Sequence, residues 1–84
     1  MWFVYIVECA DNTLYTGITT DINRREEEHN SSEKGAKFTK MRRPVKIVFT
    51  QECEDRSEAS KKEYAIKKLT RKKKIEIIEG KIEL

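Results

Sequence analysis

Residues 4–29 read VYIVECADNTLYTGITTDINRREEEH, and this segment predicts two strands followed by a helix. The runs at 4–6 and 14–18 are β-branched and aromatic, and turn residues at 10–13 separate them, as is typical of a β-hairpin. Thr20 or Asp21 can cap a helix N-terminus, so a helix is expected over about 21–30.

One face of this expected helix is unusual. Ile22, Arg25, Glu26 and His29 stand at i, i+3, i+4 and i+7, which places them on a single stripe. An amphipathic helix ordinarily fills its core-facing stripe with Leu, Ile or Ala. We therefore predict that this helix presents polar groups to a cleft.

The first strand, over residues 2–8, is apolar on both faces, which predicts a central strand covered on both sides. The parity of the hairpin loop decides where Tyr5 and Tyr15 lie relative to each other, because side chains alternate along a strand. We expect an odd number of loop residues, since a shared site requires both hydroxyls on one face. Gly17 is expected to leave room for a close neighbour, such as a helix or a phosphate.

The remaining chain predicts one more strand and two more helices. Residues 35–43 are basic and irregular, with room for one helical turn, and 45–50 form a third strand that alternates in hydrophobicity. A loop over 51–56 leads to a helix opened by Ser57. Its inward stripe contains Ala59, Glu63 and Ile66, with Tyr64 and Leu69 flanking. A last helix begins near Thr70, with Ile75 and Ile78 as its apolar positions.

The expected fold class is therefore α+β, a three-stranded, mainly antiparallel sheet flanked by helices in the order ββαβαα. Eighty-four residues make one domain, 1–84, with a core over about 2–74 and a C-terminal helix over about 70–80. Cys9 and Cys53 lack metal-binding spacing and are expected to be buried thiols in a reducing cytoplasm. No apolar run approaches the roughly 18 residues of a membrane span. The N-terminus lacks the basic start of a signal peptide, so a cytoplasmic location is expected.

The charge is unevenly distributed. Residues 34–74 contain 15 basic and 5 acidic groups, a net charge of +10, although the whole chain carries only +3. This distribution predicts binding to a polyanion. The alternative interpretation is a set of solvated, lysine-rich helix faces.

The ordered set Tyr5, Tyr15-Thr16-Gly17, Arg25 and His29 resembles the GIY-YIG nuclease superfamily. That group includes the N-terminal cleavage domain of the excision-repair nuclease UvrC and several homing endonucleases. The sequence is most similar to small stand-alone members, which share the segment present here as Gly35-Ala36-Lys37-Phe38-Thr39. The resemblance covers about residues 2–74. It departs from the family pattern at Phe3, where the first triplet ordinarily has glycine.

The resemblance implies catalytic roles for Tyr5, Tyr15, Arg25 and His29. It implies that Arg25 stabilises negative charge at phosphorus and that Tyr15 acts as general base, which for a phenol requires a nearby cation or metal-bound water. It also implies that Glu63 holds a single Mg²⁺ or Mn²⁺ ion. Each residue also has a structural alternative: the tyrosines as sheet aromatics, Arg25 and His29 as surface or packing residues, and Glu63 as an ion-pair partner of Arg25 or a lysine.

Five basic residues of the middle segment are better interpreted as contacts to the nucleic-acid backbone than as catalysts: Lys37, Lys40, Arg42, Arg43 and Lys46.

Three functions are consistent with these features. The first is a metal-dependent endonuclease or DNA-processing domain, for example in DNA repair, that acts on nucleic acid, with DNA favoured over RNA. The second is a nucleic-acid-binding module that keeps the fold without cleavage and needs a protein partner, because no additional DNA-binding domain is present. The third is a structural domain without a nucleic-acid role, which leaves the inward Arg25, His29 and Glu63 unexplained.

Overall fold

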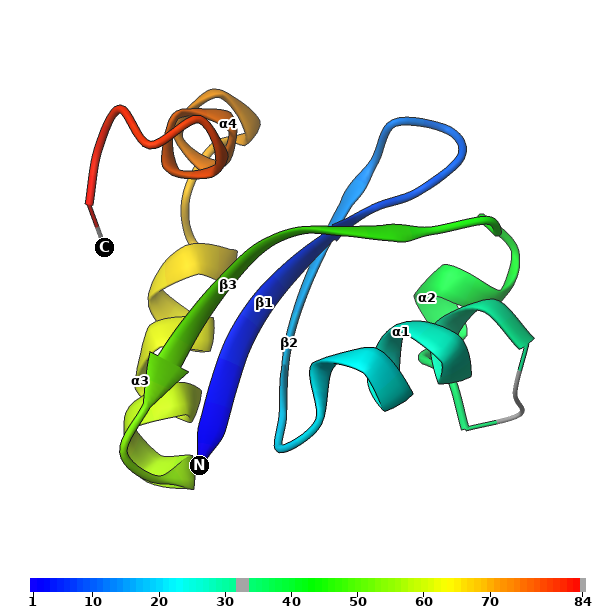
Figure 1. The fold of residues 1–84 in the computed structure, drawn as a ribbon. Helices are drawn as coiled ribbons and strands as arrows, with labels where there is room; N and C mark the ends of the chain where they lie inside the picture. The colour runs from blue at the N-terminus through cyan, green and yellow to red at the C-terminus, as the bar shows by residue number, and fades with distance from the viewer. Residues whose placement is uncertain (32–33, 84) are drawn as a thin grey trace.

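A computed structural model describes residues 1–31 and 34–83, and it contains a three-stranded antiparallel sheet in the order β2-β1-β3 (Figure 1). The strands are β1 (Trp2–Glu8), β2 (Leu14–Thr19) and β3 (Lys46–Cys53). The helices are α1 (Ile22–Ser31), the single turn α2 (Lys37–Lys40), α3 (Arg56–Lys67) and α4 (Arg71–Ile78). The α+β class and the predicted order ββαβαα are confirmed.

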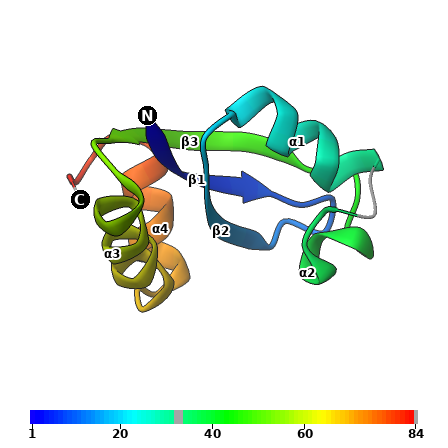
Figure 2. The ribbon, with the colours of Figure 1, turned by 90° about the horizontal axis from the view of Figure 1, so that it is seen from below.

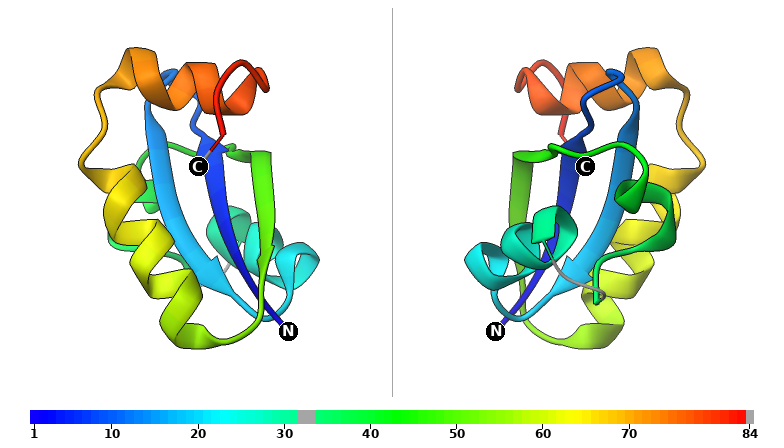
Figure 3. Two further views of the ribbon diagram at one scale, coloured as in Figure 1. Left: turned by 90° about the vertical axis from the view of Figure 1, so that its left-hand side faces the viewer. Right: turned by 90° about the vertical axis from the view of Figure 1, so that its right-hand side faces the viewer.

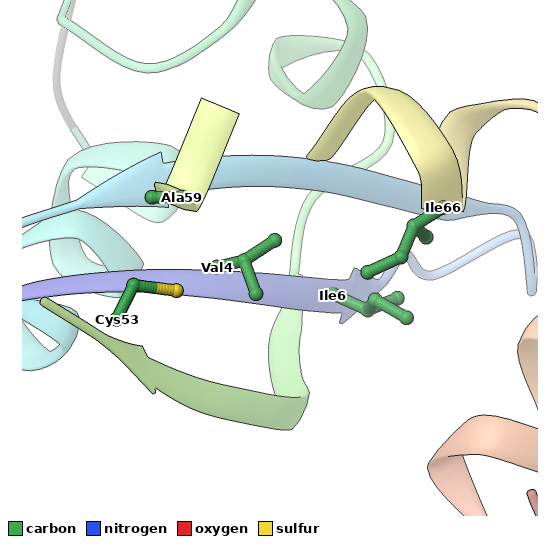
Figure 4. Packing of buried hydrophobic residues seen from close by; sticks show 5 residues of the cluster. All are labelled: Val4, Ile6, Cys53, Ala59 and Ile66. Atoms are coloured by element: carbon green, nitrogen blue, oxygen red, sulfur yellow. The ribbon is translucent and has the colours of Figure 1, made fainter. Parts of the chain in front are cut away.

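Helices cover both faces of the sheet, with α1 on one side and α3 and α4 on the other (Figure 2). On the α3 side, Val4 and Ile6 pack with Ala59 and Ile66, all fully buried (Figure 4). On the α1 side, Tyr5 and Val7 form a second cluster with Cys9 and Val45. The prediction that β1 is central and covered on both faces is confirmed.

The hairpin register places the two tyrosines on one face. Tyr15 pairs with Val7, and Gly17 pairs with Tyr5. Directly opposed residues of a β-ladder point to the same side, so Tyr5 and Tyr15 both face α1. Because Glu8 pairs with Leu14, residues 9–13 form the odd-numbered loop that we expected.

Strand β3 differs from its prediction in three ways, the first of which is that it begins at Lys46 instead of Val45. It continues to Cys53, so residues 51–53 of the expected loop are strand, because they pair with the first residues of β1. A β-bulge between Ile6 and Val7 breaks the expected alternation. Ile47 therefore packs on the Tyr5 side, whereas Val48 and Phe49 pack on the opposite side.

The helices follow the prediction with local corrections. Asp21 caps α1, accepting a hydrogen bond from the Arg24 amide at 3.0 Å. α3 begins one residue earlier than expected, capped by Asp55. Tyr64 does not flank the buried stripe, since it is 63% exposed. In α4 the fully buried residue is Ile77, Ile78 packs against the core as expected, and Ile75 is only half-buried. The helix lies across the end of the sheet (Figure 3).

Both cysteines are buried free thiols, as expected. Among the described residues, no helix is long and apolar enough to span a membrane.

Candidate active site

The phenol of Tyr5 crosses the sheet toward the free edge of β2 and lies directly over Gly17. A Cβ atom at Gly17 would lie 2.7 Å from the Tyr5 Cζ atom, closer than side-chain packing allows. The space that Gly17 leaves is therefore occupied by the ring of its cross-strand partner, and not by a helix or phosphate as predicted. The Gly17 position thus sets the direction of the Tyr5 hydroxyl.

α1 positions His29 next to the Tyr5 hydroxyl. The stripe predicted on α1 does face the sheet, and His29 is fully buried at its end. The His29 Nε2 atom lies 2.7 Å from the Tyr5 hydroxyl oxygen. On its other side, His29 Nδ1 lies 2.8 Å from the hydroxyl oxygen of Thr39 in α2, a residue that is also fully buried.

The hydrogen bonds around Thr39 assign the tautomer of His29. The Thr39 hydroxyl donates its one hydrogen to the Ala36 carbonyl at 2.9 Å. With its hydrogen directed to that carbonyl, the Thr39 oxygen accepts from His29, and we assign the proton to Nδ1. The Ala36 amide, which also points at Nδ1, is 3.5 Å away, beyond the usual hydrogen-bond length. The Nε2 atom of neutral His29 then accepts from the Tyr5 hydroxyl, and the Tyr5 oxygen in turn accepts from Arg25 Nε at 3.4 Å. The result is a directed chain from Arg25 through Tyr5 and His29 to Thr39.

Burial keeps this chain neutral at Tyr5 and His29. Burial lowers the pKa of His29 to about 4, and the positive charge of Arg25 acts in the same direction. Burial likewise raises the pKa of Tyr5, against the opposing effect of its hydrogen bond with Arg25. At neutral pH, Tyr5 is therefore a hydrogen-bond donor and His29 is an acceptor at Nε2.

Arg25 is held by the end of α1 and the segment that follows it. Its Nη1 lies 3.1 Å from Glu28 Oε1 and donates to the Lys34 carbonyl at 2.7 Å. Its side chain remains 23% exposed, whereas Tyr5 and His29 are almost inaccessible. Of these three groups, the guanidinium is the one that solvent or a ligand reaches.

Tyr15 connects the buried chain to the surface. Its ring meets the His29 ring edge-on, with centroids 5.6 Å apart. It stacks against Phe38 of α2 at the same centroid distance, and the Lys67 ammonium lies 5.8 Å from its ring centroid. The aromatic cluster thus extends from the buried imidazole to the half-exposed Phe38.

Glu63 lies on α3, which packs against the face of the sheet opposite α1. Its carboxylate pairs with Lys67 at 3.4 Å, and its side chain is 24% exposed. It is thus joined to a lysine, one of the partners weighed from the sequence, and not to Arg25. It is near enough to the hydroxyl cluster that its charge adds to burial in raising the pKa of Tyr5.

The structure therefore brings Tyr5, Tyr15, Arg25 and His29 into one contiguous cluster. Glu63 does not join it: it lies on the helix that covers the other face of the sheet, and its link to the cluster is Lys67, which pairs with its carboxylate and lies over the Tyr15 ring. No group of three His, Cys, Asp or Glu side chains that could enclose a metal occurs among the described residues. Glu26, the other polar residue of the α1 stripe, accepts a hydrogen bond from the Ile47 amide at 2.7 Å. It joins α1 to β3 instead of facing a cleft.

The predicted backbone-contact residues differ in their surroundings. Arg43 donates to the His29 carbonyl at 2.6 Å and so secures the end of α1. Arg42 covers the Phe38 ring at 4.0 Å and lies 3.2 Å from Asp11. Lys37 and Lys46 are exposed, Lys40 is half-buried, and the Lys46 ammonium is 4.0 Å from Glu8.

The sequence identifies Gly35 and Thr39 as members of a shared segment but assigns neither a role. A Cβ at Gly35 would lie 2.6 Å from the Glu28 carbonyl oxygen, so glycine lets the chain turn tightly past α1 and bring α2 beneath His29. A buried histidine requires a hydrogen-bond partner for each ring nitrogen. The segment Gly35-Ala36-Lys37-Phe38-Thr39 was the available signal for the partner of the single histidine.

Comparison with known proteins gives a consistent result. A family profile described as the GIY-YIG catalytic domain matches residues 1–76. A UPF0213 protein of Desulfotalea psychrophila is 63% identical over 79 residues, covering 94% of this chain and 72% of the relative. A Staphylococcus aureus UPF0213 protein is 54% identical over 76 residues, covering 90% of this chain and 92% of the relative.

Two solution NMR structures are also similar. A UPF0213 protein from Bacillus halodurans has a TM-score of 0.59 and 44% identity, covering 94% of this chain and 84% of its own. A protein from E. faecalis has a TM-score of 0.63 and 45% identity, and the match covers 93% of this chain and 82% of the E. faecalis chain.

Proposed function

The chain belongs to the GIY-YIG catalytic-domain family, and on that premise we propose that it is a nuclease that hydrolyses phosphodiester bonds, with DNA as the favoured substrate. The observation that carries this proposal is the chain of contacts from Arg25 through Tyr5 to His29, with Tyr15 against the imidazole. A structural core has little reason to bury an imidazole, a phenol and part of a guanidinium together, because each polar atom must find a partner.

Exposure divides the roles among these residues. Arg25 and Tyr15 are accessible, so we assign them to contact with the substrate. The guanidinium stays charged at any working pH and matches the geometry of phosphate oxygens, so it binds the scissile phosphate and stabilises the charge that develops there. Tyr5 and His29 are buried, so they act as positioning residues that hold the orientation of Arg25 and Tyr15.

We assign the orientation of the attacking water to Tyr15. Its ring position is held by edge contact with His29 on one side and by stacking on Phe38 on the other. The Lys67 ammonium lies 5.8 Å from its ring centroid, on the side of α3.

We propose that the divalent ion binds at Glu63. Mg²⁺ accepts one or two carboxylates and takes its other ligands from water and substrate phosphates, so a single glutamate suffices. Glu63 would hold the ion, and Lys67 would give up its contact with that carboxylate. When bound, Mg²⁺ or Mn²⁺ supplies neutralisation of the phosphate charge and activation of a water molecule.

One observation favours a second candidate, a nucleic-acid-binding module that does not cleave. Glu63 already has a cationic partner in Lys67, and Arg25 is engaged by Glu28 and the Lys34 carbonyl. A site whose charged groups are satisfied internally can bind a backbone without activating it.

A substrate panel separates the two candidates. The full chain is incubated with single-stranded, duplex and flapped DNA and RNA, each with Mg²⁺, Mn²⁺ or EDTA. The nuclease hypothesis expects metal-dependent cleavage of at least one substrate and its loss in Arg25→Ala. Binding without any cleavage would support the module, and neither binding nor cleavage at low salt would reject both.

A further inference from the structure

Basic side chains follow the outer edge of β2 away from the candidate site. The sheet order leaves one side of β2 without a partner strand, and Tyr15 belongs to this strand. The Lys67 ammonium lies 5.8 Å from the Tyr15 ring centroid. The next helix, α4, begins at Arg71 and crosses the hairpin end of the sheet (Figure 3), where Arg71 Nη1 donates to the Asn12 carbonyl at 2.6 Å. The connection between α3 and α4 therefore follows the β2 edge from Tyr15 to the hairpin loop.

A cleft along this edge, which we call the edge cleft, contains the charged groups of α4. It has a volume of about 270 Å³ and is lined by Thr13, Leu14, Phe38, Arg71 and Lys74. Leu14 packs on the face of the sheet that α3 covers, whereas Phe38 stacks on Tyr15 on the other face. The cleft thus straddles the strand edge. Because Arg42 and Tyr15 already cover the Phe38 ring, the groups that the cleft offers to a charged ligand are the two cations of α4.

These two cations have no carboxylate partner in the part of the chain that the structure describes. Lys73, between them and outside the cleft, lies 3.8 Å from Glu76 one turn along the helix. Arg71 and Lys74 instead stand three residues apart on α4, and like charges at this spacing repel each other. Lys74 is also half-buried, unlike a lysine on a fully solvated helix face. An anion bound between the two side chains would offset their repulsion.

The chemistry of the edge cleft suits the oxygens of a phosphate. Arg71 directs one of its five N–H donors at the Asn12 carbonyl, which fixes the guanidinium and leaves donors for a ligand. The one carboxylate of the hairpin loop, Asp11, accepts a hydrogen bond from the Thr13 hydroxyl at 2.6 Å and lies 3.2 Å from Arg42. Its charge is therefore balanced by Arg42 and does not neutralise the two cations of α4.

We propose that the edge cleft binds the phosphodiester backbone of the substrate strand beside the cleaved bond, with one phosphate held between Arg71 and Lys74. A strand rises about 3.3 Å per residue, so the β2 edge covers about 10 Å between Tyr15 and Asn12. The phosphate in the cleft is therefore a neighbour of the scissile phosphate, which we assign to Arg25. The proposal rests on the proposed function and adds to it the path of the strand, from the site along the β2 edge towards the hairpin loop.

This path differs from the contact set expected over residues 37–46. In that segment Arg42 covers Phe38, and Arg43 donates to the His29 carbonyl at 2.6 Å. Both guanidinium groups are thus engaged in holding α2 and the end of α1. The α4 pair is the better candidate for a contact that positions the backbone without reading its sequence.

The chain offers a matched pair of variants. Lys74→Met removes the ammonium from the edge cleft and keeps the length of the side chain. Lys72→Met removes an equal charge from the same helix outside the cleft. General electrostatic attraction treats the two lysines alike, whereas a phosphate held in the cleft does not. Urea melts verify that both variants are folded.

The experiment measures the affinity of the full chain for DNA in EDTA by fluorescence anisotropy at a series of salt concentrations. The probes are labelled strands of two unrelated sequences, each alone and paired with its complement. The slope of log affinity against log salt should become less steep by about 1 in Lys74→Met, because one phosphate contact is lost. Lys72→Met should change the slope much less. The effect of Lys74→Met should be the same for both sequences, since the contact is to the backbone.

Equal changes of slope in the two variants, an unchanged slope in Lys74→Met, or a loss confined to one sequence would overturn the proposal. A parallel cleavage assay in Mn²⁺ keeps the two hypotheses apart. Cleavage by wild type, together with a wild-type slope in Lys74→Met, rejects the edge cleft alone. A reduced slope in Lys74→Met without any cleavage by wild type supports the edge cleft and rejects the nuclease, and a wild type that binds no DNA at low salt rejects both.

Discussion

Replacing Thr39 with valine should switch the tautomer of His29. The substitution keeps the branched shape but removes the oxygen that accepts the Nδ1 proton at 2.8 Å. The remaining neighbour of Nδ1 is the Ala36 amide at 3.5 Å, which is itself a donor. The imidazole can then satisfy both nitrogens only by moving its proton to Nε2 and donating to Tyr5.

The expected cost follows from the bonds that are lost. The Ala36 carbonyl keeps the amides of Thr39 and Lys40 at 3.0 and 3.2 Å, so it remains satisfied. The cost therefore falls on the buried imidazole, and one unsatisfied buried donor costs about 1–3 kcal/mol of unfolding free energy. The tautomer switch recovers part of this, which places the expected loss in the lower half of that range.

His29 is the only histidine, so ¹⁵N NMR of the imidazole reports the tautomer directly. Wild type should show a protonated Nδ1 and an unprotonated Nε2, and Thr39→Val should show the reverse. Thr39→Ser should restore the wild-type signals. Urea denaturation measures the accompanying loss of stability.

Thr16 provides a matched control for this experiment. Its hydroxyl is buried without a hydrogen-bond partner among the described residues, so Thr16→Val should leave stability unchanged or raise it. A wild type with its proton on Nε2, or a Thr39→Val variant that loses neither stability nor tautomer, would refute the directed hydrogen-bond chain.

Two further predictions test the same cluster. Because the pKa of His29 is about 4, against about 6.5 in an unfolded chain, the unfolded state binds the extra proton between these values. The free energy of unfolding should thus fall by about 3 kcal/mol on account of His29 as the pH drops from about 6.5 through about 4. Urea melts of His29→Gln should lack this pH-dependent loss. If wild type and His29→Gln lose stability equally over this pH range, the predicted contribution of His29 is excluded. Gly17→Ala should displace the Tyr5 ring, since the new Cβ would lie 2.7 Å from Cζ. A denaturant melt should show that the free energy of unfolding falls by about 1–3 kcal/mol, and any cleavage should be lost. A variant as stable and active as wild type would contradict the packing of Tyr5 over Gly17.

Local sequence patterns predicted the strands and helices whose apolar residues recur at a regular spacing or whose ends carry capping residues. The two apolar faces of residues 2–8 predicted a central strand, and β1 is central. The 3.6-residue period from Ile22 to His29 predicted which face of α1 meets the sheet, and His29 is buried there. These features depend on periodicity, which a single sequence carries in full.

Features set by pairing between distant segments were not predictable in this way. The bulge that sends Ile47 and Phe49 to opposite faces arises from the register between β1 and β3. The partner of Glu63 depends on the side-chain direction within α3, where Lys67 is one turn away. The role of Thr39 depends on a tight turn at Gly35, for which the sequence provides only the glycine itself.

The central claim, that this cluster is a phosphodiesterase site completed by Glu63, is tested most directly by Glu63→Gln. The variant keeps the shape of the side chain and removes its charge. Because its partner Lys67 is 50% exposed, the pair contributes at most about 1 kcal/mol, and the variant should melt in EDTA within that margin of wild type. Cleavage of the panel substrates in Mn²⁺ is then compared between the two proteins. We predict that wild type cleaves and that Glu63→Gln, although folded, does not; a folded Glu63→Gln that cleaves as fast as wild type, or a wild type that cleaves nothing, would contradict the claim.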